Sequence, residues 1–398
     1  MDINYIEPSF DELLDPPAPN DGPGILKYLE RIGRVCYKSE GKMTEDSAEG
    51  FIDRLMKRGH HSIIEHYIFS FAVSPKIYRS VCVNPVDQDG NEDYINALRY
   101  IHYTNNKNKD LPRYIISGNI RAFNNLMKYA PDSRRDCYGL ERIMGMLRSI
   151  VPNMVVAPEW VEPISISDEL RFMKREEIWK LPADVRKYHN WYGIKFTMDR
   201  SISHQAVRHR DASYAQESTR YVNYSNKGYT VVLPGWMPDG IKKALMAHDD
   251  DPQKWSQFDA AMVVGTKAWC MGVKQALETY NYMLGMKEHD FAPQDLKGVI
   301  VDSIKTDIYI TANENEWNWI YSLRTGEGVY PDTRRVYSEA RDYVEGNLVP
   351  LYADKPMTEE ELEAKKERLM KMLSEVKEEM LDEIGSTAVR VSDEESSH

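Results

Sequence analysis

The segment over residues 191–221 constrains this chain more than any other part of its sequence. Residues 191–198 favour a β-strand, and the stretch directly after them holds four arginines and two histidines. Apolar and aromatic residues are interleaved with these charges, namely Ala206, Val207, Ala212 and Tyr214. The segment therefore cannot lie wholly in solvent, and a buried arginine needs a partner. The nearby acids, Asp211 and Glu217, are too few for all four arginines.

An external anion is a reasonable missing partner. Arginine suits phosphate because its planar guanidinium donates two parallel hydrogen bonds and keeps its charge. Serine hydroxyls and loop N–H groups can complete such a site. A charge-rich stretch is more often a solvated surface. The interleaved apolar residues favour an anion-binding segment here.

Composition limits the class of protein. The 398 residues can form one large domain or two smaller ones, and 42% hydrophobic with 29% charged residues is ordinary for a soluble protein. Since no run of about 20 apolar residues and no leader occurs, we expect a cytoplasmic protein without a membrane partner. The cysteines are scattered, which fits a reducing compartment: Cys36, Cys82, Cys137 and Cys270. A net charge of −12 argues against nucleic acid as a partner.

Periodicity predicts a mixture of helices and strands. Helical spacing or composition predicts helices over residues 25–37, 44–59, 114–130, 240–290 and 294–324. Residues 67–73 predict a further strand, and the proline-rich residues 1–24 predict an extended arm. Residues 356–398 predict a charged helix and a disordered tail, because Thr358 and Glu361 form a capping box before an apolar stripe. That stripe indicates packing on the chain's own domain or on a sister subunit.

The spacing Arg208-His209-Arg210, then seven residues, then Ser218 resembles the signature of the flavin-dependent thymidylate synthases, the ThyX family. The agreement extends over residues 199–221 at fixed spacing. Two further blocks agree in the family's order, residues 60–66 and residues 305–324. We therefore expect one family domain over residues 25–350, with an insert at about 84–190.

The resemblance implies a fold and an activity. The fold is α+β, a curved antiparallel sheet flanked by helices, here with helical insertions and a C-terminal helix. The activity is the conversion of dUMP to dTMP with FAD as cofactor, and with methylenetetrahydrofolate and NADPH as co-substrates. Reduced flavin, rather than an enzyme nucleophile, activates the base. Members are homotetramers whose sites are shared between subunits, so a homotetramer is expected.

Carried over residue by residue, the resemblance assigns six residues to FAD: His60, Ser62, Arg208, His209, Arg210 and Asn313. It assigns five to the nucleotide, chiefly to its phosphate: Gln205, Arg208, Gln216, Ser218 and Arg220. Arg324 would face the N3–O4 edge of uracil, where a fixed cation stabilises developing negative charge. Arg324 and Ser218 are the predicted catalytic residues.

Three histidines in the first family block leave alternatives open: His60, His61 and His66. Clusters of histidine and glutamate can bind zinc. The block lacks the His-Glu-x-x-His spacing and has no cysteine nearby. A structural cluster and contact with flavin are the other two interpretations, and no metal is expected.

Several positions depart from the family's pattern. Lys297 stands where members usually have a phosphate-binding arginine, which would turn a bidentate contact into a point charge. Asn315 replaces a usual arginine near the flavin, and Asp332 falls near a usual histidine. These departures leave two alternatives open. One is flavin-dependent hydroxymethylation of dUMP or dCMP, and the other is a non-catalytic nucleotide-binding assembly protein.

Overall fold

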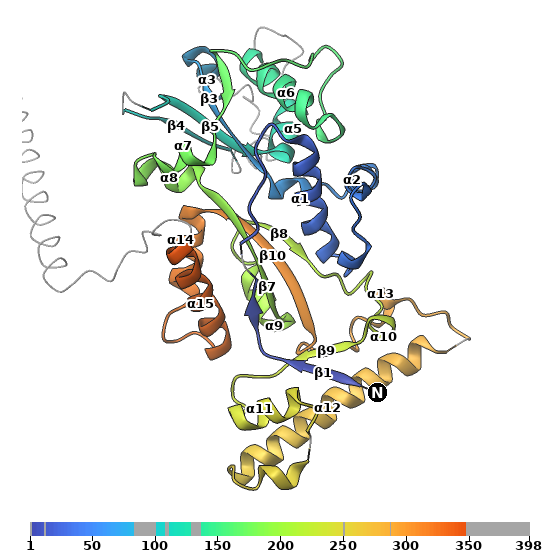
Figure 1. Ribbon diagram of the computed structural model, residues 1–398. Coiled ribbons are helices and arrows are strands. Elements are labelled where there is room, and N and C mark those ends of the chain that lie inside the picture. The colour runs from blue at the N-terminus through green and yellow to red at the C-terminus, as the bar shows by residue number, and fades with distance from the viewer. Residues whose placement is uncertain are drawn as a thin grey trace, which may run out of the picture. The chain divides into compact units, whose positions relative to one another are not determined.

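Two long antiparallel strands, β7 (Trp191–Asp199) and β10 (Lys305–Asn313), form the scaffold of the region that carries the predicted site (Figure 1). The computed structural model describes residues 2–11, 13–82, 101–107, 111–128, 137–249, 251–286 and 288–347. The short strands β2 (Ser9–Phe10) and β8 (Ser213–Gln216) complete a four-stranded antiparallel sheet in the order β2-β7-β10-β8. The predicted helix at 356–398 lies outside the described residues.

Two further sheets are present in the described part of the chain. One is an antiparallel sheet whose strands lie in the order β4 (Ile101–Asn105), β5 (Tyr114–Asn119), β3 (Ile68–Val73) and β6 (Leu170–Phe172). The other pairs β1 (Ile3–Ile6) with β9 (Tyr229–Val232) in parallel. The proline-rich segment at the start of the chain thus contributes strands to two sheets.

Helices surround these sheets. The described helices of the N-terminal half are α1 (Gly22–Val35), α2 (Ser47–Lys57), α3 (Pro75–Cys82), α5 (Ile120–Lys128) and α6 (Tyr138–Ile150). The middle holds α7 to α11, at Arg175–Trp179, Ala183–His189, Arg200–Ala206, Tyr224–Lys227 and Asp239–Met246. The last four, α12 to α15, are Ala260–Leu284, Pro293–Leu296, Glu314–Arg324 and Pro331–Asn347. Short 3₁₀ turns occur at Glu40–Lys42, His61–His66, Pro152–Met154 and Pro252–Trp255. None of the described helices is both long and apolar enough to span a bilayer.

The predicted α+β class with antiparallel sheets is confirmed, as are the helices near residues 25–37 and 44–59. The helix predicted over 294–324 is wrong in its centre, where β10 lies. Both faces of β10 are buried, so its apolar run lacks the alternation that marks a half-exposed strand. The helix predicted within 114–130, after residues 117–119, is confirmed and begins at Ile120, where β5 ends.

Both ends of the β7–β10 pair start a helix. Asp199 caps α9 at one end, where it pairs with Lys305, and Asn313 caps α14 at the other end, opposite Trp191. The 11 residues of α14 span about 16 Å, which carries the last residue of the helix, Arg324, back along the sheet towards α9. Antiparallel pairing therefore brings together two segments more than 100 positions apart in sequence.

Aromatic packing fixes α14 and α15 to one face of the pair. The indole of Trp317 donates to the backbone carbonyl of Tyr192 at 3.1 Å. The rings of Phe196 and Tyr337 stack at 4.8 Å between centroids. All four residues are at most 4% exposed, and this burial stabilises the helix that carries Arg324.

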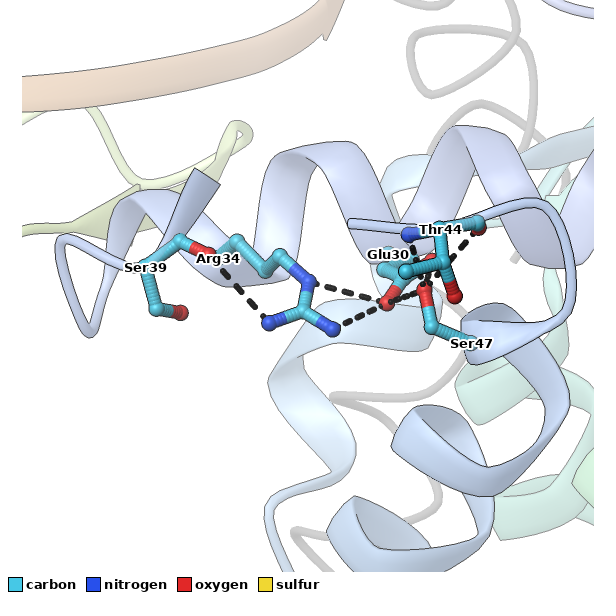
Figure 2. Close-up of polar contacts among 5 residues, drawn as sticks. All are labelled: Glu30, Arg34, Ser39, Thr44 and Ser47. Carbon is cyan, nitrogen blue, oxygen red and sulfur yellow. Dashed lines mark hydrogen bonds and ion pairs between the residues drawn. The ribbon is translucent and has the colours of Figure 1, made fainter. Parts of the chain in front are cut away.

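A buried polar cluster fixes the end of α1 (Figure 2). The carboxylate of Glu30 accepts from the guanidinium of Arg34 and from the hydroxyl of Ser47 at the start of α2. Arg34 also donates to the backbone carbonyl of Ser39. Since Glu30 is fully buried, removing Arg34 would leave the carboxylate charge without compensation. The cluster holds the turn after α1, which contacts the candidate site.

Candidate active site

The predicted anion-binding segment folds as a short helix, a loop and a short strand. Asp199 caps α9 by accepting the backbone N–H of the third residue beyond it, at 2.7 Å. After α9, the hydroxyl of Tyr214 lies 2.9 Å from the carbonyl of Ala206 and 2.8 Å from that of His209. These contacts close the loop over residues 208–210 against β8.

Arg324 joins this segment from α14. Its Nη2 donates to the backbone carbonyl of Gln205 at 2.7 Å, and its Nε donates to Nε2 of His209 at 3.1 Å. Its Nη1 makes a long contact of 3.4 Å with the side-chain oxygen of Gln205. Three of the predicted site residues, Gln205, His209 and Arg324, therefore meet directly.

His209 is buried between two charged groups. Burial, and then the nearby Arg324, lower the pKa of His209 to about 4, so the ring is neutral at pH 7. Its Nδ1 lies 3.7 Å from Oε1 of Glu316 in the first turn of α14. Burial, and then the charge of Asp211, raise the pKa of Glu316 to about 7. The site thus places one fixed cation beside a neutral imidazole and an acid that titrates near neutrality.

Three of the four arginines of the segment are at the surface. Arg208, Arg210 and Arg220 are exposed, whereas His209 is 5% exposed. The guanidinium of Arg220 lies 5.7 Å from the ring centre of Tyr221. Among the described residues, Arg208 and Arg220 have no carboxylate partner. Their charge is therefore available to an anion from outside the chain.

One acid that could have neutralised these arginines is used elsewhere. Glu217 is 2% exposed and accepts from Nζ of Lys305 at 3.0 Å. Lys305 also donates to Asp307, which accepts in turn from the hydroxyl of Thr197 at 2.7 Å. This buried group joins β8 to β10 and leaves the surface arginines without Glu217.

Three hydrogen bonds fix the end of β8 and the turn that follows it. Nε2 of Gln216 donates to the hydroxyl of Ser203 at 2.8 Å. The backbone N–H of Ser218 donates to the carbonyl of Cys36, in the turn fixed by the Glu30 cluster, at 3.0 Å. The hydroxyl of Ser218 accepts the backbone N–H of Arg220 at 3.3 Å. The predicted nucleotide-binding residues 216–220 thus occupy a fixed turn.

His60 meets the same turn from the upstream block. Gly59 ends α2 with φ of 74°, in the left-handed region that favours glycine, and so directs the chain into His60. Nδ1 of His60 lies 2.7 Å from the hydroxyl of Tyr37. The ring of Tyr221 lies 5.6 Å from that of Tyr37 and 6.3 Å from that of His60. These three rings connect the two family blocks predicted to contact flavin.

Three other predicted residues are placed differently. Asn313 is 2% exposed, with its oxygen capping Glu316 N–H at 2.8 Å and its nitrogen 3.2 Å from His102. Ser62 and Lys297 are exposed, and neither forms a hydrogen bond or ion pair with another predicted site residue in the described part of the chain. Their assigned contacts remain predictions.

The three upstream histidines have separate partners. His61 lies 3.3 Å from the carbonyl of Met56, and His66 lies 2.8 Å from the hydroxyl of Thr311. Burial lowers the pKa of His66 to about 3. Across the described residues, no three histidine, cysteine or acidic side chains are grouped as metal ligands would be. His66 acts here as a neutral link between the two antiparallel sheets.

A cavity of about 760 Å³ adjoins His66 and Thr311. It is lined by the arm over residues 15–20, by β3, by residues 172–179 and by the start of β7. None of the predicted site residues lines it. The exposed arginines of the candidate site lie outside this cavity.

The sequence did not single out Tyr37, His102 or Glu316, which all contact predicted residues. Tyr37 and His102 carry no signal, because their contacts come from distant segments. Glu316 follows Asn313 by three positions, which is the spacing of a helix cap, and this alone could have marked the start of α14. Asp332 is buried, its carboxylate against Gly235 rather than beside Arg324.

A family model described as thymidylate synthase complementing protein matches residues 22–81 and 189–351, more than half of the chain. The chain belongs to this family. The match covers every predicted site residue and is interrupted over residues 82–188. The resemblance to the ThyX family is thereby confirmed.

Curated relatives in the family are distant. The flavin-dependent thymidylate synthase of Geobacter sulfurreducens is 27% identical over 163 residues, 41% of this chain and 59% of the relative. That of Mycobacterium avium is 29% identical over 154 residues, 36% of this chain and 52% of the relative. The chain thus spans between half and three fifths of the length of these relatives.

A solved structure from Helicobacter pylori, thymidylate synthase X with FAD and dUMP, overlaps with a TM-score of 0.31 at 19% identity, over 43% of this chain and 75% of that chain. A UMP/dUMP methylase, PolB, from Streptomyces cacaoi overlaps with a TM-score of 0.32 at 16% identity, over 42% and 71%. Overlaps of this extent add nothing to the family assignment.

Proposed function

We propose that this chain is a cytoplasmic enzyme of its family that converts dUMP to dTMP with FAD, methylenetetrahydrofolate and NADPH. The observation that carries the proposal is the contact of Arg324 with Gln205 and His209, beside exposed arginines in the family's signature segment. The named activity of the curated relatives supports it.

The donor set fits FAD and a nucleotide. A flavin diphosphate and a nucleotide monophosphate together bring about four negative charges at pH 7. Arg208 and Arg220 are exposed without carboxylate partners among the described residues, so they can bind phosphate without first breaking an ion pair. FAD, when bound, would supply the reducing equivalents. Arg208, His209, Arg210, His60, Ser62 and Asn313 are the residues proposed to contact it.

Arg324 would orient and polarise the pyrimidine. Its guanidinium is held along one edge by Gln205 and His209, which leaves Nη1 as the donor with the weakest internal contact. A cation held in this way costs no reorganisation when negative charge develops on a uracil oxygen. The neutral ring of His209 accepts from the cation rather than repelling it.

The nucleotide phosphate would lie at the turn after β8. Ser218 and Arg220 belong to that turn, and Gln216 precedes it at the end of β8. Gln205 is proposed to reach the nucleotide from α9. Lys297 is proposed as a further phosphate ligand. It is exposed at the end of α13, so its contribution depends on where the substrate reaches.

Two measurements test this function. Protein purified without added cofactor should be yellow, and it should convert dUMP to dTMP when methylenetetrahydrofolate and NADPH are present. A colourless protein that does not acquire flavin and forms no dTMP would refute the proposal. Turnover that is lost on Arg324→Ala also rules out a non-catalytic assembly protein.

A hydroxymethylating enzyme is the second candidate. It is motivated by Asn315, which replaces a usual cation and is partly exposed beside Glu316, and by Lys297. The substrate would be dUMP or dCMP, which a titration of the flavin spectrum with each nucleotide distinguishes. Mass spectrometry of the product decides the chemistry, because a gain of one methyl group excludes hydroxymethylation.

A homotetramer is proposed for the assembly. The long helix α12 exposes apolar side chains along its length, with Val264 66%, Met271 72% and Tyr282 72% exposed. Apolar side chains in such a row favour burial against another chain. The C-terminal segment, residues 356–398, is proposed to contribute to a subunit interface. Deleting it should reduce the oligomer mass, and an unchanged mass in light scattering would contradict that role.

A further inference from the structure

Glu316 lies on the far side of His209 from Arg324, although no part of the family signature assigns it a role. It is 8% exposed and belongs to the first turn of α14, whereas Arg324 ends the same helix. Its carboxylate oxygen is 3.7 Å from Nδ1 of His209. A single imidazole ring therefore separates the carboxylate from the guanidinium.

The hydrogen-bond directions through this ring are determined by chemistry. A guanidinium can only donate, so the contact of 3.1 Å between Nε of Arg324 and Nε2 of His209 requires a lone pair on Nε2. A neutral imidazole with a lone pair on Nε2 carries its proton on Nδ1. That proton faces the carboxylate of Glu316.

The backbone that carries Glu316 is itself held in place. The backbone N–H of Glu316 donates to the side chain of Asn313 at 2.8 Å, and the amide of Asn313 contacts His102 at 3.2 Å. A cap of this kind fixes the first turn of the helix and with it the start of the Glu316 side chain. Glu316 can therefore orient the His209 ring rather than follow it.

We propose that Glu316 is a positioning residue: it holds His209 as the Nδ1–H tautomer, and the Nε2 lone pair then holds Arg324 in the orientation that binds the pyrimidine. The inference deepens the proposed function and rests on it for the identity of the ligand. Without an acceptor at Glu316, the ring is free to place its proton on Nε2, where it faces Arg324. Arg324 then loses one of its two closest contacts and leaves its position.

The test is a double-mutant cycle read by dUMP affinity in titration calorimetry of the full chain with its flavin. Glu316→Met removes the acceptor at similar volume, and Arg324→Ala removes the group it acts on. We expect Glu316→Met to weaken dUMP binding about 10-fold in the wild-type background and less than about twofold in the Arg324→Ala background, because residues that act as one unit are non-additive. Equal losses in both backgrounds overturn the inference, since a general structural role would persist without Arg324.

Two companion variants keep the test valid. Glu316→Gln retains a carbonyl oxygen that accepts from Nδ1–H, so it should keep dUMP affinity within about threefold of wild type. A loss as large as that of Glu316→Met would mean that the tautomer is not the cause. Glu339→Gln makes the same change at an exposed glutamate of α15 and should bind as wild type does. A wild-type protein that binds no dUMP refutes the proposed function and this inference together, whereas wild-type binding with additive losses refutes the inference alone.

Discussion

Arg324 donates to the backbone carbonyl of Gln205 at 2.7 Å and thereby joins the last residue of α14 to the end of α9. The two helices begin at opposite ends of the β7–β10 pair and run towards each other. The contact exists only when both helix caps and the strand register are formed. The geometry of the candidate site is therefore a consequence of the sheet.

Arg324→Lys should abolish most of the proposed turnover. A lysine ammonium cannot donate to the Gln205 carbonyl and the His209 ring in one plane while it also faces a substrate. Losing one preorganised donor at developing negative charge costs about 10²- to 10³-fold in kcat. Steady-state kinetics on dUMP measure the effect. Arg341→Lys, at a partly exposed position of α15, is the matched control, and a kcat for Arg324→Lys within threefold of that control would contradict the role.

Helices and strands with clear hydrophobic periodicity are predictable from the sequence, and those without it are not. Strand β7 is predicted from its sequence, and the caps at Asp199 and Asn313 are standard signals. Strand β10 is buried on both faces, so its apolar run suits a helix equally well. A central strand of this kind is recognised only once its partners are known.

The site was predictable where it follows a motif. The resemblance assigned Gln205, His209 and Arg324 to FAD or the nucleotide, and in the structure these three residues contact one another. Glu316 and Tyr37 were not predictable, because their contacts arise from the register of β7 with β10 and from the turn after α1. A buried glutamate gives no sequence signal of its partner. The ligand contacts themselves remain predictions.

The protein should lose stability on mild acidification. Burial is the main cause that lowers the pKa of His66 and His189 to about 3 and that of His209 to about 4. Their unfolded pKa is near 6.5, so unfolding takes up protons below that pH. The stability that these rings contribute is complete above about pH 6.5 and falls at lower pH, by up to about 1.4 kcal/mol per pH unit for each ring.

The titration of Glu316 changes the stability with pH in the opposite direction to that of the histidines. Its folded pKa of about 7 lies above its unfolded value, so its contribution is complete at low pH and is lost as pH rises through 7. Three histidines lower the free energy of unfolding as pH falls and one carboxyl raises it, so we expect a net loss of stability on acidification. Melting temperatures between about pH 7.5 and pH 5 measure it. The fall should be smaller in His189→Asn, and a melting temperature that does not change over this range would contradict the account.

Replacing one partner of the buried ion pair of Arg186 and Glu314 should lower the free energy of unfolding more than replacing both partners. Nε and Nη2 of Arg186 each lie 3.1 Å from an oxygen of Glu314, and these residues are 7% and 1% exposed. Arg186→Met leaves a buried carboxylate and should cost about 3–5 kcal/mol of unfolding free energy. Arg186→Met with Glu314→Leu should recover most of that loss. Denaturant unfolding measures both, and a double variant less stable than the single one would contradict the unpaired carboxylate as the cause of the loss.

Substitutions of Asn313 distinguish its role as the N-cap of α14 from its proposed contact with flavin. Its oxygen accepts the backbone N–H of Glu316 at 2.8 Å, so Asn313→Ala should cost about 1 kcal/mol of stability, whereas Asn313→Asp keeps an oxygen cap. The aspartate removes the amide that contacts His102 and adds a negative charge near the proposed flavin phosphates. We therefore expect Asn313→Asp to retain the melting temperature but to release flavin more readily than wild type, as measured by absorbance after dialysis. If Asn313→Asp retains flavin as wild type does, Asn313 serves only as the cap of α14, and the cofactor contact belongs to the other proposed residues.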